Sequence, residues 1–204
     1  MSYILSFRKP KHISTLPNFE GRYYNKNPGI NWSTFIPITA KPIKYLEIGV
    51  SDGGNAIHIA NSYCKNPESK IYCVDPWMDY DGYPENKGRQ EKGWLTFNKN
   101  IQRSGSYSKF IIKRGLSEDI VPTFDNEFFD LIFVDGNHET AYVYADGKMA
   151  FDKAKTGGNI IFDDYSSNWI QTMKGIDMFL DEYKTRIKIL SKSNKFVQVI
   201  IQKL

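Results

Sequence analysis

Short apolar runs that alternate with longer amphipathic segments constrain the fold of this chain more than any other feature of its sequence. Five runs rich in Ile, Val, Phe and Tyr fit strands that are buried on both faces: Tyr45–Val50, Lys70–Val74, Phe110–Lys113, Leu131–Val134 and Asn159–Phe162. Candidate helices occupy Asn55–Tyr63, Gln90–Arg103, Ser117–Val121, Tyr142–Lys155 and Trp169–Tyr183. Because each gap between strands is long enough for a crossover, we expect parallel strands in successive βαβ units.

Two more β-like runs close the chain. Arg186–Ser191 and Phe196–Gln202 are separated only by the polar turn Lys192–Lys195, and so short a link predicts an antiparallel hairpin. The sequence therefore predicts an α/β fold, namely a doubly wound, Rossmann-like, seven-stranded and mostly parallel sheet with a C-terminal antiparallel hairpin. In open sheets of this kind, ligands bind at the carboxyl ends of the strands.

The 204 residues, of which 41% are hydrophobic, suit one globular domain, which we place at residues 45–204. Residues 1–44 stand outside the alternating pattern as an N-terminal arm with several prolines. Two roles fit this arm: a cap over a substrate, or a segment that simply packs against the domain.

Charge and cysteine content exclude several classes of protein. The net charge of +4 comes from 27 basic residues scattered among 23 acidic ones, which does not indicate a nucleic-acid-binding surface. Cys64 and Cys73 form neither a zinc motif nor a disulfide framework. With no signal-peptide pattern and no run of about 20 apolar residues, we expect a cytoplasmic protein without a membrane partner. The sequence leaves open whether it forms a homo-oligomer.

The most specific local motif runs from Glu47 to Asn55, with the sequence Glu-Ile-Gly-Val-Ser-Asp-Gly-Gly-Asn. It leaves an apolar strand, turns on glycines and enters a helix. Glycine is needed where the backbone takes positive φ or approaches a ligand closely, and the helix N-terminus offers unpaired N–H donors. Asp75 ends the next strand about 20 residues later, where the ribose-binding acid of a nucleotide site belongs. Together they predict a nucleotide-type or adenosyl site.

Acidic residues also end the fourth and fifth strands. Asp135 follows the fourth strand, and Asp163 and Asp164 follow the fifth. Because the ends of strands 1, 4 and 5 should be neighbours, we expect these carboxylates to converge, which is costly unless a cation or hydrogen-bond donors compensate. Carboxylate oxygens suit a hard divalent ion, Mg²⁺ first. The alternative is that these acids cap helices or bind an amino group of the ligand.

His138 lies three residues after Asp135 and should sit at the mouth of the same crevice. A histidine near neutral pH is a suitable general base for a hydroxyl group. His58, inside a predicted helix, and His12, in the arm, fit surface or packing roles instead.

These residues resemble a known family, the class I S-adenosylmethionine (SAM)-dependent methyltransferases. Within it, Asp135-Gly-Asn-His138 and Phe162-Asp-Asp-Tyr165 resemble the metal-dependent sugar O-methyltransferases of the macrocin and mycinamicin type, and catechol O-methyltransferases more distantly. The resemblance covers roughly residues 44–183. No Asn-Pro-Pro-Tyr or Asp-Pro-Pro-Tyr element follows the fourth strand, unlike in enzymes that methylate amino groups of nucleic acid bases.

The resemblance implies roles for individual residues. The cofactor SAM would be bound by Glu47, Gly49, Ser51, Gly53, Asp75, Trp77, Ser117 and Asp135, with Trp77 near the adenine and Ser117 at the adenine edge. Asp135, Asp163 and Asp164 would bind the metal, and His138, together with Asp135, would be catalytic. Ser51 stands where many members of the family have a glycine.

The implied function is metal-assisted transfer of a methyl group from SAM to a hydroxyl of a sugar or glycan, or of another small-molecule acceptor. A catechol-like acceptor, a metal-dependent hydroxylase or hydrolase on the same scaffold, and a non-catalytic SAM-binding module are alternatives. Some aromatic and apolar residues could form a stacking wall for the acceptor or belong to core and lid packing: Tyr23, Tyr24, Trp32, Trp169 and Met173.

Overall fold

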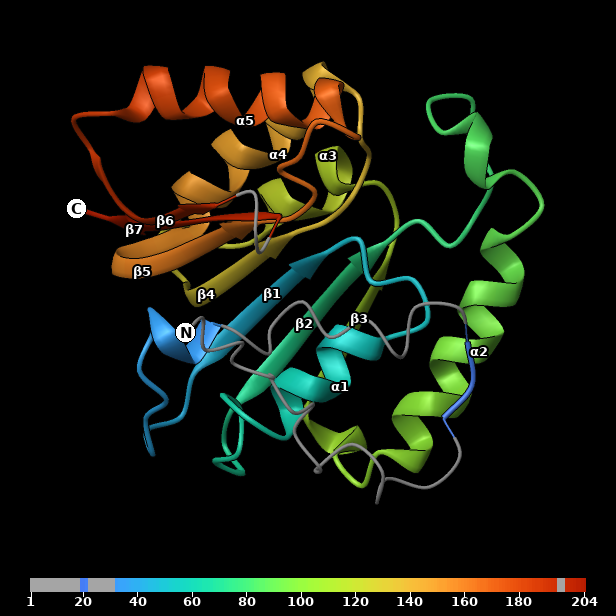
Figure 1. The fold of residues 1–204 in the computed structure, drawn as a ribbon. Coiled ribbons are helices and arrows are strands. Elements are labelled where there is room, and N and C mark those ends of the chain that lie inside the picture. The colour runs from blue at the N-terminus through green and yellow to red at the C-terminus, as the bar shows by residue number, and fades with distance from the viewer. Residues whose placement is uncertain (1–18, 22–31, 194–196) are drawn as a thin grey trace, which may run out of the picture.

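The structure is a computed structural model that describes residues 19–21, 32–193 and 197–204. Its centre is a seven-stranded sheet with the strand order β3-β2-β1-β4-β5-β7-β6 (Figure 1). The strands are β1 (Lys44–Ile48), β2 (Lys70–Asp75), β3 (Phe110–Arg114), β4 (Phe129–Val134), β5 (Ala154–Phe162), β6 (Ile187–Ser193) and β7 (Gln198–Lys203). The first five are parallel, and β7 runs antiparallel to both β5 and β6. The predicted fold class is confirmed.

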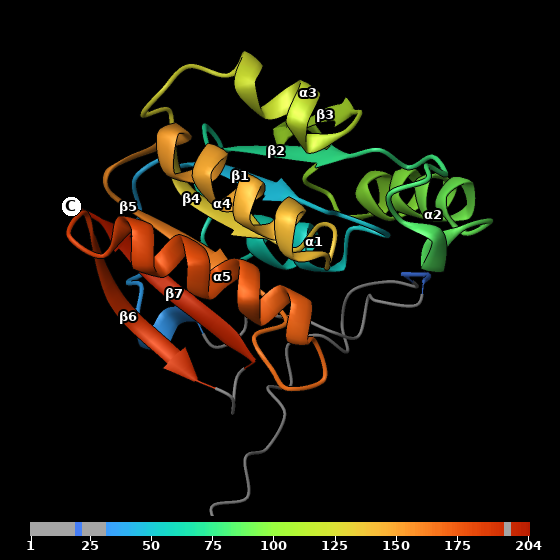
Figure 2. The same cartoon turned by 90° about the horizontal axis from the view of Figure 1, so that it is seen from above.

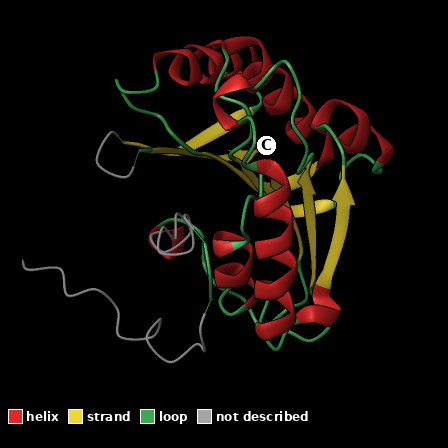
Figure 3. Cartoon of the chain, turned by 90° about the vertical axis from the view of Figure 1, so that its right-hand side faces the viewer, coloured by secondary structure: helices red, strands yellow, loops and turns green. Residues whose placement is uncertain are grey.

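Helices cover both faces of the sheet (Figures 2 and 3). Helices α1 (Gly54–Ala60) and α2 (Gln90–Arg103) pack on one face, and α3 (Ser117–Ile120), α4 (Thr140–Lys153) and α5 (Ile170–Tyr183) pack on the other. Short 3₁₀ turns occur at Pro84–Asn86, Tyr107–Lys109 and Val121–Thr123. None of the described helices has the length and apolar character needed to cross a bilayer.

Side chains along the central strands alternate between two hydrophobic cores. On β1, Leu46 and Ile48 belong to the core under α4 and α5, whereas Tyr45 belongs to the core under α1. This alternation follows from the two-residue period of a strand, and it requires apolar residues at nearly every position of a sheet that is covered on both faces. The near-continuous apolar runs in the sequence have this cause.

Element boundaries differ from the predicted ones by a few residues, most of all at β5. This strand begins at Ala154, five residues before the predicted start, because Ala154 pairs with Phe129 and the register then shifts before Asn159 pairs with Leu131. The Gly157-Gly158 pair therefore lies within an irregular strand and not in a turn. Helix α4 accordingly ends at Lys153, and β6 extends to Ser193, into the predicted turn.

Two described parts of the N-terminal arm pack against the domain. Trp32 is fully buried beside Tyr45, Tyr63 and Phe133, and its indole N–H donates to Gln198 Oε1 at 2.9 Å. Glu20 is held by two hydrogen bonds between its backbone and the Asn100 side-chain amide, of 3.0 and 2.7 Å. Trp32 is thus a core residue, while Tyr23 and Tyr24 lie outside the described residues.

Candidate active site

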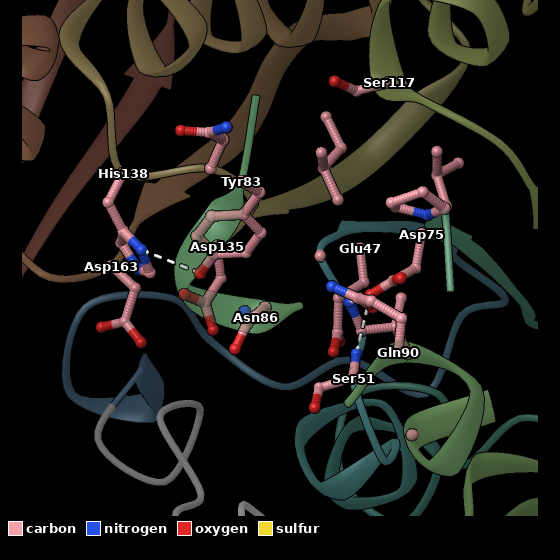
Figure 4. Close-up of a pocket in the computed structure, with 18 of the residues that line it drawn as sticks. Glu47, Ser51, Asp75, Tyr83, Asn86, Gln90, Ser117, Asp135, His138 and Asp163 are labelled. Atoms are coloured by element: carbon pink, nitrogen blue, oxygen red, sulfur yellow. Dashed lines mark hydrogen bonds between the residues drawn. The ribbon is translucent and has the colours of Figure 1, made fainter. Parts of the chain in front are cut away.

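A cavity of about 1270 Å³ opens at the carboxyl ends of the parallel strands (Figure 4). Its walls come from the segments that follow β1, β2, β3, β4 and β5, and from Glu20 and Gly21 of the arm. Residues of α2, α4 and β7 complete the lining. Pockets for one drug-sized ligand usually measure about 300–1,000 Å³. This cavity therefore has room for a cofactor and a second molecule.

The glycine turn after β1 forms one wall of the cavity. Gly49 and Gly53 both have φ of +83°, and a Cβ atom at Gly49 would lie 1.9 Å from the carbonyl oxygen of Asp135. Position 49 therefore admits only glycine, because a side chain would push β1 and β4 apart at their ends. Gly53 precedes α1 and lies beside Phe97, and unlike Gly49 and Ser51 it does not line the cavity.

Asp75 fastens this turn to the end of β2. Its Oδ2 accepts hydrogen bonds from the backbone N–H groups of Val50 (2.8 Å) and Ser51 (2.9 Å), and its Oδ1 accepts from the N–H of Trp77 (2.8 Å). Burial raises the pKa of this carboxyl group, and the three N–H donors oppose that shift. Asp75 also lines the cavity, so the same carboxyl group shapes the turn and faces the cavity.

Glu47 is a second buried acid in the cavity wall. It accepts hydrogen bonds from the Tyr45 hydroxyl (2.5 Å) and the Asn55 amide (3.0 Å). Burial nevertheless raises the pKa of Glu47 to about 8. A positively charged group of a ligand at this position would therefore stabilise the ionised carboxylate.

His138 is held on several sides at the opposite end of the cavity. Its Nε2 lies 3.0 Å from Asp164 Oδ2, and its Nδ1 lies 3.0 Å from the Tyr83 hydroxyl. Its ring stacks on Trp169, with 4.3 Å between ring centroids. Figure 4 shows His138 beside Tyr83 and Asp163, away from Ser51 and Asp75. The histidine is therefore fixed in orientation, as a general base should be.

The acidic residues that end β4 and β5 do converge. Potential ligand atoms of Asp135, His138 and Asp164 lie within 4.8 Å of one another, and this group differs from the predicted metal set by having His138 in place of Asp163. Asp163 instead accepts a hydrogen bond from Gln198 Nε2 at 3.1 Å. Burial, followed by the charge of Asp164, raises the pKa of Asp163 to about 6.

The structure places the remaining candidate residues differently. Trp77 is fully buried between Trp94 and Phe97, donates its indole N–H to the carbonyl of Ser51, and does not line the cavity. It braces the glycine turn from behind and is not placed to stack on an adenine. Ser117 does line the cavity. Met173 packs against the core, whereas Trp169 lines the cavity.

Several cavity residues were missed by the sequence reasoning: Tyr80, Tyr83, Asn137, Asp146 and Gln198. Asn137 donates to the Gly82 carbonyl (2.8 Å) and the Tyr80 hydroxyl (3.2 Å), which ties the segment after β2 to the loop after β4. Asn137 lies within the Asp135-Gly-Asn-His138 motif, and Asp146 also carries a sequence signal. It falls on the same helical face as Val143 and Ala150, where an apolar residue would be expected.

Three buried acids give the ligand-free protein an unusual dependence on pH. The pKa is raised to about 8 for Glu47, to about 7 for Asp146 and to about 6 for Asp163. Between about pH 4 and 8 the folded state thus retains protons that the unfolded chain has released, so the free energy of unfolding falls as pH rises through these values. With a chelator present, we expect thermal scans at constant ionic strength to show Tm falling by on the order of 10 °C from pH 5.5 to 8.5. A Tm that rises between pH 5.5 and 8.5 would contradict the raised pKa values of these three acids.

Comparison with known proteins places the chain in a family. An uncharacterised protein of Acanthamoeba polyphaga mimivirus is 26% identical over 167 residues, which cover 80% of this chain and 69% of the viral protein. An O-methyltransferase from Bacillus cereus in complex with SAH superposes with a TM-score of 0.63 at 16% identity, over 93% of this chain and 86% of that one. An O-methyltransferase of Streptomyces achromogenes involved in tomaymycin synthesis, in complex with SAM, gives 0.62 at 14% identity, over 93% of both chains.

At this level of identity the two solved structures establish a shared fold. A family model described as a methyltransferase domain matches residues 46–165, from β1 through the Asp163-Asp164 pair. This region is more than half of the chain and supplies most of the cavity's walls. The protein therefore belongs to the methyltransferase domain family.

Proposed function

We propose that this protein transfers the methyl group of SAM to a hydroxyl oxygen of a small acceptor, with a sugar or glycan as the acceptor class and a divalent cation as an aid. One observation carries the proposal. A single cavity holds the glycine turn with Asp75 at one end and His138 with Asp135 and Asp164 at the other. The O-methyltransferases named above, which bind SAM or SAH on the same fold, support it.

The first half of the cavity fits the cofactor. The turn at Gly49 and Ser51 brings backbone close to the ligand, and Asp75 stands at the end of β2, where a ribose-binding acid belongs. Glu47, whose pKa is raised by burial, would gain from the positive charge of the methionine ammonium group. The methyl group would then point toward His138.

The second half of the cavity fits a hard cation. Asp163 and Asp164 are adjacent carboxylates, and burial, followed by the charge of Asp164, raises the pKa of Asp163, so a bound cation would stabilise both carboxylates in the ionised form. Asp135 and Asp164, which belong both to the predicted metal set and to the group that converges in the structure, would hold the ion. When bound, such a cation acts as a Lewis acid toward oxygen.

His138 would manage the proton of the acceptor. In the tautomer that donates from Nε2 to Asp164, Nδ1 is left as an acceptor, which the Tyr83 hydroxyl now occupies. An acceptor hydroxyl would replace the Tyr83 hydroxyl at Nδ1. The acceptor oxygen would form a bond to the methyl carbon while the hydroxyl proton passes to His138. The carbon–sulfur bond breaks in the same step, and the sulfur leaves as a neutral thioether. Alignment and proton removal are the contributions of the protein.

A catechol-like acceptor is the second candidate. Trp169 and Tyr83 flank His138, with ring centroids 4.3 and 5.7 Å from the imidazole, and Tyr80 and Tyr142 extend this wall. Aromatic faces stack on planar aromatic rings as well as on sugar rings. A panel of acceptors should therefore contain both classes, with vicinal hydroxyls in each.

The test combines binding with product analysis. We expect calorimetry to show binding of SAM and SAH, and mass spectrometry to show one added methyl group on an acceptor oxygen when a panel of sugars and catechols is supplied. Removing divalent ions with EDTA, or replacing Asp164 by Asn, should slow transfer at least about tenfold while SAH still binds. Asp181→Asn, at an exposed position of α5, is the matched control. If neither SAM nor SAH binds, the proposal is wrong.

A further inference from the structure

Asp146 is a buried acid in the cavity for which the transfer reaction has no use. It lies on α4, is only 3% exposed, and shares the inner face of the helix with Val143, Gly147 and Ala150. A carboxyl group at a core position costs free energy unless hydrogen bonds or a ligand compensate. Burial raises the pKa of Asp146 to about 7, so the protein alone compensates it poorly.

Only one oxygen of this carboxyl group is engaged by the described residues. The Ser117 hydroxyl donates to Oδ1 at 2.6 Å, and within the described ranges no hydrogen bond is made to Oδ2. Oδ2 lies over the turn after β4, because a Cβ atom on Gly136 would be 3.2 Å from it. Asp146 and Gly136 both line the cavity, so Oδ2 is available to accept a hydrogen bond from a ligand.

The position of this oxygen matches one part of the cofactor. The reacting end of the cavity is at His138, at the left of Figure 4, and Ser117 lies apart from it at the top of the view. With the ribose at Asp75 and the methyl group directed toward His138, the base must lie against the remaining wall, which Leu116, Ser117 and Gly136 form.

We propose that Asp146, held by Ser117, selects the adenine base of the cofactor by accepting a hydrogen bond from its exocyclic amino group at Oδ2. This inference rests on the proposed function, since it assumes an adenosyl cofactor. Hypoxanthine carries a carbonyl oxygen where adenine has the amino group, so at about pH 8.5, where the Asp146 carboxyl group is ionised, an inosyl cofactor would set two acceptors against each other. A buried site built to bind an N–H group rejects analogues that lack it.

The experiment compares SAH with S-inosylhomocysteine by calorimetry at about pH 8.5, above the pKa of Asp146. Wild-type protein should bind SAH roughly ten- to a hundredfold more tightly than the inosyl analogue, because a hydrogen bond to a charged group contributes about 1.5–3 kcal/mol. In Asp146→Asn, the amide can donate to the carbonyl of the analogue, so the preference should shrink to within about threefold. Ser117→Ala, which leaves the carboxyl group less well oriented, should reduce the preference by a smaller factor.

Asp152→Asn is the matched control, since Asp152 is an exposed acid on the same helix. This control should keep the wild-type preference, and circular dichroism should show all three variants folded. An Asp146→Asn variant that is folded and still prefers SAH as strongly as wild type overturns the assignment of Asp146, while SAH binding leaves the proposed function intact. Wild-type protein that binds neither compound would instead disprove the proposed function, and the inference with it.

Discussion

Replacing Asp75 by asparagine is expected to weaken the binding of both SAM and SAH by about a hundredfold or more. The carboxylate accepts three backbone hydrogen bonds, two of them from Val50 and Ser51 in the glycine turn. An asparagine side chain has one acceptor oxygen, so its amide NH₂ must face at least one N–H donor, and each hydrogen bond lost from a charged acceptor costs about 1.5–3 kcal/mol. Under the proposed function, the substitution would also remove the acid that is placed to bind the ribose.

Calorimetric titration of SAH into the purified variant would measure this loss. Asp81→Asn provides the control, because Asp81 is an exposed acid in the same segment after β2 and should not alter the affinity. Thermal unfolding should show a folded variant with a lowered Tm, since the glycine turn is less well held. SAH affinity within a few-fold of wild type would mean that Asp75 neither shapes the turn for the cofactor nor touches the ribose.

The fold and the glycine turn that forms one wall of the cavity could be predicted because their signals are local. A strand buried on both faces needs a continuous apolar run, and the turn that follows β1 needs glycine at position 49, where no Cβ atom fits. The carboxyl ends of parallel strands meet at one edge, so the acids after β4 and β5 had to be neighbours. Each step uses residues close together in sequence or a general property of parallel sheets.

The partners of these acids could not be predicted, because they come from distant segments whose register the sequence does not specify. Gln198 reaches Asp163 only because β7 pairs antiparallel with β5, with Val199 opposite Phe162. Tyr83 reaches His138 across 55 positions, from a segment with no regular pattern. The predicted ligand set consequently contained Asp163, whereas the group that gathers in the structure contains His138.

Trp77 shows how local context can mislead. Its place just after the Asp75-Pro76 pair suggests a loop side chain facing the ligand. The backbone of Trp77 has a φ of +41°, and its side chain lies among Trp94 and Phe97 beneath the glycine turn. Burial of this large aromatic ring against α2 and the glycine turn outweighs the strain of that backbone conformation. Neither the strain nor the partners are visible in the sequence around Trp77.

Replacing His138 by alanine is expected to lower kcat for methyl transfer by ~10²–10⁴-fold, the usual contribution of a general base. The imidazole of His138 is oriented by the Asp164 carboxylate at one nitrogen and contacts a hydroxyl, that of Tyr83, at the other, where an acceptor hydroxyl could take its place. SAH binding should change little, because the residues that fit the cofactor, such as Asp75, lie at the other end of the cavity. A loss of kcat with an intact cofactor affinity separates a base from a residue that only supports the fold.

Steady-state rates of methyl transfer across pH would test this expectation, measured with a saturating concentration of an acceptor that wild-type protein methylates. The rate of His138→Ala should recover in part at high pH, where hydroxide replaces the missing base, whereas wild-type protein should gain nothing from this route. His58→Gln is the matched control, since His58 lies on α1 outside the cavity and should keep the wild-type profile. A His138→Ala variant that retains both the rate and the pH profile of wild type would show that the acceptor loses its proton without His138. The histidine, which stacks on Trp169 and makes two hydrogen bonds, would then serve to position Asp164 and Trp169.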